Sequence, residues 1–293
     1  MLAAALAAGC TDTNITAPSI AGGGILFASD RRDANFELYR VGAAGGPVER
    51  LTTDLAHNDL APALSADGGR IAWEREIATP SGLTEVELWV MDADGGNARA
   101  VVDNGSENRS PSWTADGGAL VYASFVTGNW EIFRVDLATG ATTNLTESPF
   151  ADQAPRVTRD GASVLFHTNR DVQFEVYVMD ADGGNARNLS RSDADDRYPV
   201  PTPDGGVVWS RFTDSFDLWI MDGDGDGQRA ITWTAYEELS PSVSPDGGEV
   251  VYQTNRLPPQ GLEIVPIGGG TPRAVLTDDG SGSALHPFWG SAP

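Results

Sequence analysis

Three aspartates in the last third of the chain have a spacing that suits a calcium ion. Asp222, Asp224 and Asp226 alternate with glycines in the stretch MDGDGDGQR. Carboxylate oxygens are ligands that calcium prefers, and glycine lets a short loop wrap around an ion. An EF-hand loop that begins at Asp222 would also need a bidentate glutamate at its twelfth position, where this chain has Trp233. The sequence predicts no cofactor and leaves calcium open as an alternative.

The same stretch occurs twice more without the third aspartate. MDADGGNAR stands at residues 91–99 and again at residues 179–187, and the three copies have equal length. Nothing has been inserted to make a metal loop, and only Asp226 is an added acid. The comparison favours a hairpin turn over a calcium site, because Asp-Gly pairs suit tight turns.

A second group of side chains suits a transition metal. Of three histidines, His57 and His286 each stand shortly before a proline that anchors the repeat, and Asp59 follows the first. We expect both histidines in neighbouring connections, and imidazole and carboxylate are common zinc ligands. No local ligand spacing joins the two histidines, so two unrelated surface histidines are the simpler interpretation.

Sequence signatures of common enzymes are missing from the chain. It has no Gly-x-Ser-x-Gly elbow, no His-Glu-x-x-His motif, no phosphate loop and no dinucleotide fingerprint. The sequence therefore predicts a protein that is not an enzyme. The alternative is a metal-dependent enzyme, similar to a polysaccharide lyase or hydrolase, with its site at the mouth of a channel.

The composition limits the partners. The net charge is −23, and all 19 basic residues are arginines. Such a chain lacks the basic patch that nucleic acid or an anionic lipid surface requires. No run after residue 10 approaches the ~18 apolar residues of a membrane span.

The first ten residues, MLAAALAAGC, resemble the signal of a bacterial lipoprotein. Small residues precede Cys10, the only cysteine, and such a signal marks its cysteine for lipid attachment after cleavage. Leu6 stands one position further from Cys10 than is usual, and no basic residue precedes it. We predict a signal-like segment at residues 1–10, a flexible tether at 11–22 and one folded domain at 23–293, with a lipid anchor at Cys10.

A repeat runs through most of the chain. Successive copies of Pro-x-x-[Ser/Thr]-x-Asp-Gly are 42–49 residues apart, close to the ~40–45 residues of a four-stranded propeller blade. Each copy leads through an Asp-Gly turn into short runs rich in aromatic and β-branched residues, as strands prefer. The anchors begin at Pro62, Pro111, Pro155, Pro199 and Pro241, with a partial copy at Pro287.

The two ends of the chain complement each other. Residues 24–52 contain the second, third and fourth strands of a unit, and the stretch around Pro287 contains only a first strand. We therefore predict an all-β protein, a six-bladed β-propeller of four-stranded blades. Its ring closes by pairing the C-terminal strand with the N-terminal blade fragment, which leaves no edge strand open.

The repeat resembles the TolB-type β-propeller repeat over nearly the whole chain. The similarity lies in Pro-x-Trp-[Ser/Thr]-x-Asp-Gly, in Asn-x-Arg or Ser-x-Arg, in Glu-[Ile/Leu]-aromatic and in Met-Asp-Ala-Asp-Gly-Gly. The resemblance implies a WD-like, six-bladed propeller used mainly for protein or peptide contacts. The family's namesake carries an α/β domain ahead of its propeller, whereas a short tether precedes the first blade here. We expect a TolB-like propeller rather than TolB itself.

Strand alternation sorts the loops onto two faces. The turns between strands one and two, and between strands three and four, are short and uniform and share one face, the turn face. The loops between strands two and three vary in length and share the other face, the loop face, with the connections between blades. Variable loops on a regular scaffold are typical of a binding surface.

A ring of polar residues is predicted at the channel mouth on the loop face. Five of the six residues that stand three positions before an anchor proline are acids or amides. Such a ring suits a cation or a partner's basic side chain, or else each member pins its own inter-blade connection. The residues are Asp59, Asn108, Asp152, Asp196 and Glu238, with His286 near the sixth position, Ala284.

Other recurring residues are expected to be architectural. An acid opens the third strand of every blade, and loop arginines such as Arg31, Arg170 and Arg256 are its expected partners. Tryptophans at strand positions are expected in the core between blades. The acids are Glu37, Glu87, Glu131, Glu175, Asp217 and Glu263, and the tryptophans are Trp73, Trp89, Trp113, Trp209 and Trp219.

The sequence thus favours a membrane-tethered, non-enzymatic propeller of the bacterial cell envelope, on its periplasmic or surface side, that binds a protein or peptide through the loop face. Two other functions stay open. One is the metal-dependent enzyme at the channel mouth, and the other is a purely structural scaffold.

Overall fold

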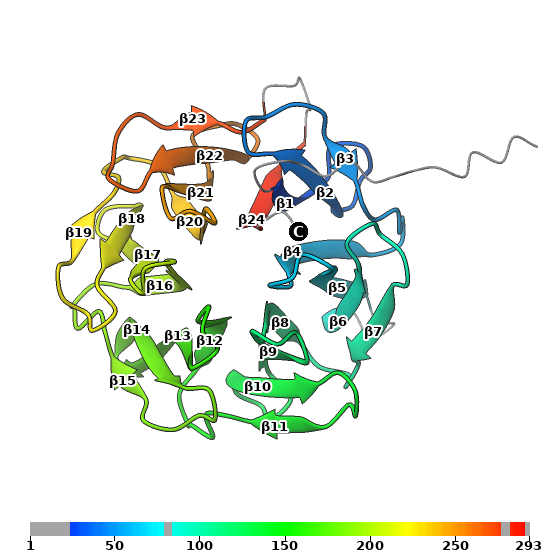
Figure 1. Ribbon diagram of the computed structural model, residues 1–293, viewed down its shortest axis with the longest axis horizontal. Helices are drawn as coiled ribbons and strands as arrows, with labels where there is room; N and C mark the ends of the chain where they lie inside the picture. Colours follow the sequence, from blue (N-terminus) through cyan, green and yellow to red (C-terminus); the bar gives the residue numbers. More distant parts are fainter. Residues whose placement is uncertain (1–23, 79–83, 277–281, 291–293) are drawn as a thin grey trace, which may run out of the picture.

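The computed structural model describes residues 24–78, 84–276 and 282–290, which form a ring of six β-sheets around a channel (Figure 1). Each sheet is a blade of four antiparallel strands, as predicted. The outermost strand of each blade has only two to four residues. In the described residues every regular element is a strand, so no helix is present that could cross a membrane.

The strands of the first three blades include one from the C-terminal end. Blade 1 consists of β24 (Ala284–Trp289), β1 (Gly24–Ser29), β2 (Glu37–Gly42) and β3 (Glu49–Arg50), blade 2 of β4 (Asn58–Leu64), β5 (Arg70–Ala78), β6 (Thr84–Asp92) and β7 (Arg99–Val102), and blade 3 of β8 (Asn108–Trp113), β9 (Ala119–Ser124), β10 (Glu131–Asp136) and β11 (Thr142–Asn144).

The other three blades follow in chain order. Blade 4 consists of β12 (Asp152–Val157), β13 (Ser163–Asp171), β14 (Gln173–Asp180) and β15 (Arg187–Asn188), blade 5 of β16 (Asp196–Pro201), β17 (Val207–Phe212), β18 (Phe216–Met221) and β19 (Arg229–Ala230), and blade 6 of β20 (Glu238–Val243), β21 (Glu249–Thr254), β22 (Gly261–Pro266) and β23 (Arg273–Ala274).

The ring closes in blade 1, where the last strand pairs with the first. β24 is antiparallel to β1, with Leu26 opposite Phe288 and Ser29 opposite Ala284, and Figure 1 shows the red strand beside the dark blue one. The sheet order is β24-β1-β2-β3. The predicted closure from both chain ends is confirmed, and it removes the open edges that a linear array of blades would leave.

The hydrophobic core is divided among the contacts between blades. Six clusters of buried side chains each join two neighbouring blades, from blades 1 and 2 around to blades 6 and 1. Trp73 and Trp209 are fully buried in two of them, as predicted for strand tryptophans. Because each blade packs on both neighbours, the ring is stabilised as one unit rather than blade by blade.

The Asp-Gly turns explain why the anchor also contains a serine or threonine. In blade 3, Thr114 Oγ1 donates to Asp116 Oδ1 at 2.6 Å, and the same oxygen accepts the Gly118 N–H at 2.9 Å. The Thr114 hydroxyl is the main cause of a lowered pKa for Asp116. Gly117 has φ +65°, which glycine tolerates best. The motif therefore specifies a closed turn on the turn face.

Three of the acids expected to open the third strands fix the connections to the next blade. Glu131 accepts the backbone N–H of Ser148 at 2.9 Å, and the same spacing along the chain recurs at Glu175 and Asp217. Of the expected arginine partners, Arg256 does pair with its acid, Glu263. Glu87 instead accepts from Trp89 Nε1 at 2.6 Å, within its own strand, so the six acids do not all make the same contact.

Two of the expected arginine partners lie elsewhere. Arg170 pairs with Asp152 at 2.9 Å, and Arg31 lies over the rings of Phe27 and Tyr39.

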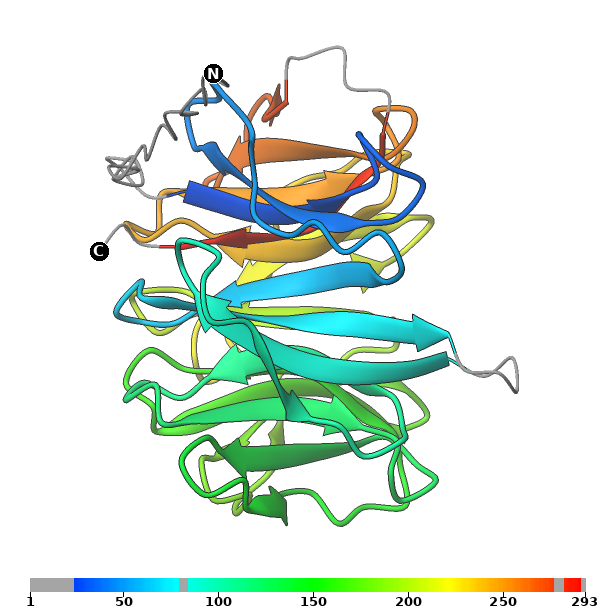
Figure 2. The same ribbon diagram turned by 90° about the vertical axis from the view of Figure 1, so that its right-hand side faces the viewer.

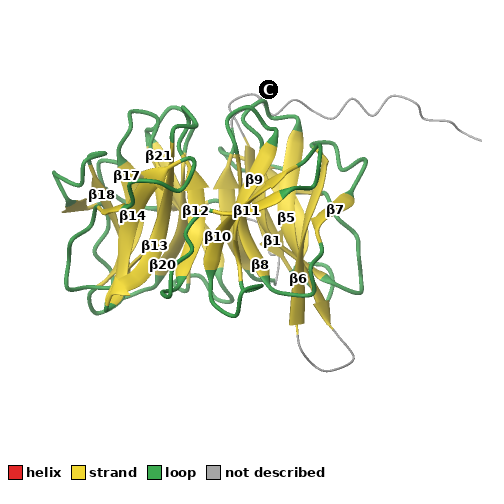
Figure 3. Ribbon diagram, turned by 90° about the horizontal axis from the view of Figure 1, so that it is seen from below, coloured by secondary structure: helices red, strands yellow, loops and turns green. Residues whose placement is uncertain are grey.

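Side views of the ring show loops gathered at its two ends (Figures 2 and 3), which are the turn face and the loop face.

Candidate functional site

Each innermost strand carries a bulge at the residue before its anchor proline. The pairing register shifts at this point in every blade, for example between Arg109 and Ser112. The bulged residue has a left-handed backbone, which costs about 1–2 kcal/mol for a residue other than glycine, and bulges redirect side chains. The residues and their φ angles are Ala61 (45°), Ser110 (56°), Ala154 (49°), Tyr198 (55°), Ser240 (51°) and His286 (50°).

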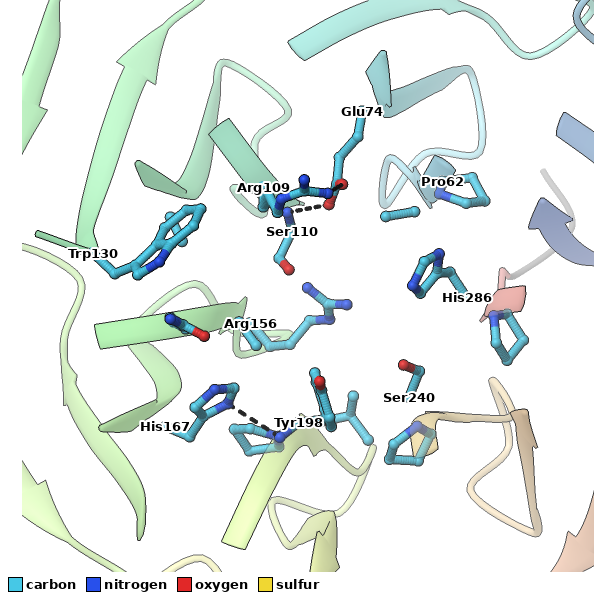
Figure 4. A pocket seen from close by; sticks show the side chains of 18 residues that line it. Pro62, Glu74, Arg109, Ser110, Trp130, Arg156, His167, Tyr198, Ser240 and His286 are labelled. Carbon is cyan, nitrogen blue, oxygen red and sulfur yellow. Dashed lines mark hydrogen bonds and ion pairs between the residues drawn. The ribbon is translucent and has the colours of Figure 1, made fainter. Parts of the chain in front are cut away.

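All six bulged residues line one cavity in the channel, at its loop-face end (Figure 4). The cavity has a volume of about 190 Å³, below the ~300–1,000 Å³ of pockets for drug-sized ligands. A second cavity of about 280 Å³ occupies the turn-face end. Arg156 lines both cavities and so stands between them. The loop-face cavity has room for one side chain or a small molecule.

One side of the loop-face cavity holds a compact ion-pair network. Arg109 Nη1 lies 3.2 Å from Glu74 Oε2, and Arg109 also pairs with Glu76 and Glu107. Glu74 Oε1 accepts the Ser110 N–H at 2.6 Å. Burial raises the pKa of Glu74, and Arg109 counteracts this effect. Both charges of this partly buried pair are therefore bound by partners within the protein.

Two histidines line the same cavity in their neutral form. Burial is the main reason that the pKa of His167 is lowered to about 3 and that of His286 to about 4. His167 Nδ1 accepts the Tyr198 N–H at 3.2 Å. His286 Nδ1 is buried without a hydrogen-bond partner in the described part of the chain. Neither imidazole supplies positive charge at neutral pH.

The predicted ring of acids and amides faces away from this cavity. Asp59 is fully buried and accepts from Trp73 Nε1 and Arg75 Nε, both at 2.8 Å. Asp196 makes the same contacts with the tryptophan and arginine of blade 5. Each aspartate therefore joins the first and second strands of its own blade.

The other three residues of the predicted ring also form hydrogen bonds or ion pairs with groups inside the protein. Asn108 Nδ2 donates to the Val86 carbonyl at 2.9 Å, Asp152 pairs with Arg170, and Glu238 accepts from two threonines. The structure corrects their expected place, because none of the five lines the cavity. Only His286 of the predicted set does so, and it lies within β24 rather than in a connection between blades.

Glu238 makes the stability depend on pH. Burial is the largest cause that raises its pKa to about 7, so folding favours the protonated form. The stability that this group contributes is complete below the unfolded pKa near 4.5 and is lost as pH rises through about 7, by on the order of 3 kcal/mol. We expect Glu238→Gln to be more stable than the native chain at pH 8 and similar to it at pH 4.5.

Urea unfolding at the two pH values tests this expectation, with Glu147→Gln as an exposed control. A Glu238→Gln variant that loses stability at pH 8 would contradict it.

The structure does not bring the two predicted histidine ligands into one metal site. His57 Nδ1 lies 2.8 Å from Asp54 Oδ2 in a connection between blades, while His286 faces the channel. Among the described residues, no group of three or more histidine, cysteine, aspartate or glutamate side chains is placed to hold a metal ion.

The aspartate triplet forms a hairpin turn between β18 and β19. The Asp222 N–H donates to the Asp226 carbonyl at 2.9 Å, and the Asp226 N–H donates to Asp224 Oδ1 at 3.2 Å. The two sibling stretches close in the same way, with N–H to carbonyl distances of 2.8 Å from Asp92 and 2.9 Å from Asp180. The added acid has left the turn geometry unchanged.

Exposed large apolar side chains lie on the loop face. All eight large hydrophobic residues that are exposed in the described part of the chain lie in its loops or at their edges. Trp233 is 70% exposed and Val172 is 87% exposed. Seven of them span consecutive blades 3 to 6, and we call these the apolar arc: Phe125, Val126, Phe150, Val172, Phe212, Trp233 and Tyr236.

Sequence reasoning missed Arg156 and all of the bulged residues except His286. The repeat carries no clear signal for them, because the position directly before each anchor proline varies in type and so does the position before that. Arg156 stands two positions after such a bulge, in a repeat position with no distinguishing motif.

Fold and cavity together define a six-bladed β-propeller with an accessible channel. The family model described as the TolB beta propeller domain matches residues 60–292. The chain therefore belongs to this family.

Individual relatives match this chain over different lengths and at different sequence identities. The Tol-Pal system protein TolB of Xanthomonas oryzae pv. oryzae is 42% identical over 60 residues, which cover 20% of this chain and 14% of that protein. TolB from Acinetobacter baumannii has a TM-score of 0.80 over 92% of this chain and 67% of that one, at 22% identity. An oligogalacturonate lyase in complex with manganese has a TM-score of 0.61 at 17% identity, over 89% of this chain and 76% of that one. Such structural likeness shows the fold alone, and this fold includes an enzyme.

Proposed function

We propose that this protein is a non-enzymatic propeller of the bacterial envelope that binds a protein or peptide through its loop face. The apolar arc carries this proposal. Its residues lie in the variable loops of a regular scaffold, where binding residues concentrate, and large aromatic residues such as Trp233 and Tyr236 are enriched at interfaces. In the described residues, the turn face has no exposed large hydrophobic side chain.

Two observations support a location in the envelope. Residues 1–10 resemble a lipoprotein signal, and a relative is named as a protein of the Tol-Pal system. Cys10 lies outside the described residues, and its lipid attachment is part of the proposal. A single anchor of this kind attaches a folded domain to the membrane surface without inserting it.

Capture of a partner from envelope extract tests the proposal. The variant Val172→Ser/Trp233→Ser removes two exposed apolar side chains, so its thermal stability is expected to stay within ~0.5 kcal/mol of the native chain. Loss of an aromatic hot spot costs about 2 kcal/mol or more in binding, so we expect partner affinity to fall by about 30-fold. The control variant Arg99→Ser/Arg159→Ser removes two exposed side chains from the turn face and should capture the partner normally.

A loop-face variant that captures the partner as well as the native chain would contradict the proposal. Native protein that captures no partner in low salt would instead favour a structural scaffold.

A further inference from the structure

The loop-face cavity contains a guanidinium without an ionic partner. Arg156 is partly exposed and lines both cavities of the channel. Its Nη1 donates one hydrogen bond, to the Pro155 carbonyl at 2.9 Å, and it forms no ion pair within the described part of the chain. Burial lowers its pKa to about 10, so it is still a cation at neutral pH. An unpaired cation in a partly desolvated site is costly unless a ligand compensates it.

The Glu74 carboxylate attracts this charge, but the two side chains form no ion pair in the described part of the chain. Glu74 is the one carboxylate among the cavity-lining residues, and it is already bound by Arg109 and by the Ser110 N–H. Arg109 is shared among three carboxylates. His167 and His286 are neutral at pH 7. Arg156 therefore supplies the available positive charge in a protein whose net charge is −23.

Hydroxyl donors lie around the guanidinium. Figure 4 shows Arg156 extending toward the middle of the cavity, with Ser110, Ser240 and His286 around it in this view. The side-chain hydroxyls of Ser110 and Ser240 are partly exposed in the cavity wall and make no hydrogen bond to another described residue. The bulges, with φ of 56° and 51°, place both serines in the cavity wall. These hydroxyls and the guanidinium are donors for an anion.

We propose that this cavity binds a carboxylate, with Arg156 as its cationic partner and Ser110 and Ser240 as further donors. The guanidinium fork matches the two oxygens of a carboxylate. A phosphate dianion would leave one negative charge uncompensated in the same cavity as Glu74. Proline rings and Trp130 complete the wall, and they suit the short carbon chain of an organic acid or an acidic side chain.

The carboxylate has two sources with the same chemistry. It is either a small organic acid free in solution or an acidic residue of the partner that docks on the loop face. Only the second source rests on the proposed function.

Titration calorimetry with sodium acetate tests the site. Acetamide has the same shape without the charge and is the ligand control. We expect the native chain to bind acetate in the millimolar range and acetamide at least tenfold more weakly. Arg156→Gln should weaken acetate binding at least tenfold, and Arg159→Gln, which removes an exposed arginine from the same blade, should change it less than twofold.

Partner capture and thermal melting distinguish the sources and guard against misfolding. Arg156→Gln is expected to melt at a higher temperature than the native chain, because it removes an unpaired cation. If it also loses partner capture at least tenfold, the partner supplies the carboxylate. If Arg156→Gln leaves both acetate binding and partner capture unchanged, the carboxylate site is overturned. The proposed function is tested separately, and it is upheld if the loop-face variant Val172→Ser/Trp233→Ser abolishes capture. The proposal would also be overturned if the native chain binds no acetate and Arg156→Gln melts at a lower temperature. That result would mean that Arg156 stabilises the fold rather than binding a ligand.

Discussion

A chain that ends at Ser283 is expected to lose its cooperative fold. Such a truncation removes β24, which supplies the innermost strand of blade 1, and takes Ala284 and Trp289 out of the cluster between blades 1 and 6. It also removes the hydrogen bond from the Trp289 N–H to Ser242 Oγ, at 2.9 Å. The ring would open at β1, and the loss should exceed the 5–15 kcal/mol of a typical domain's stability.

Circular dichroism melting of the truncated chain measures this effect. A chain that ends at Gly290 keeps β24 and should melt like the full chain. A synthetic peptide of residues 282–293 should restore the transition in trans by adding the missing strand. A truncated chain that still melts cooperatively within a few degrees of the full chain would contradict the closure.

Replacing Asp196 by alanine should cost about 3–5 kcal/mol, the range for breaking a buried ion pair from one side. The carboxylate is fully buried and accepts four hydrogen bonds. Two come from Arg211, at 2.7 and 2.9 Å, and one comes from Trp209 Nε1 at 2.6 Å. Its removal deprives the Arg211 cation of its ion-pair partner and breaks the side-chain link between the first and second strands of blade 5.

A double-mutant cycle separates the ion pair from simple loss of packing. Asp196→Ala/Arg211→Met removes both charges, so urea unfolding should find it less destabilised than the sum of the two single variants. Strict additivity, or a cost below about 1 kcal/mol for Asp196→Ala, would show that the pair does not hold the strand.

Much of the fold could be predicted because the repeat constrains it six times. A single Pro-x-x-[Ser/Thr]-x-Asp-Gly stretch is a weak signal, but regular spacing allows few architectures. The unpaired strands at the two chain ends then required closure in blade 1, and the structure confirms this at Leu26 and Phe288. The shared length of the MDGDGDGQR stretch and its siblings likewise predicted the turn at Asp222.

The site could not be predicted as well, because its side chains are oriented by partners that composition does not reveal. The Asp59 carboxylate accepts hydrogen bonds from a tryptophan and an arginine of the next strand, which lie more than ten residues further along the chain. The bulge before Pro62 interrupts the alternation from which orientation was inferred. Arg156 gains its importance only when the ring brings it to the channel, where Glu74 is already paired.

The central claim is that partners bind on the loop face, and site-specific photo-crosslinking in living cells tests it most directly. A photoreactive phenylalanine would replace Phe150 or Trp233 on the loop face, and Ala138 or Ala181 on the turn face, one position at a time in the full chain. The account predicts discrete adducts of one partner from the loop-face positions and none from the turn-face positions. Equal adducts from both faces, adducts from the turn face alone, or none at any position would contradict it.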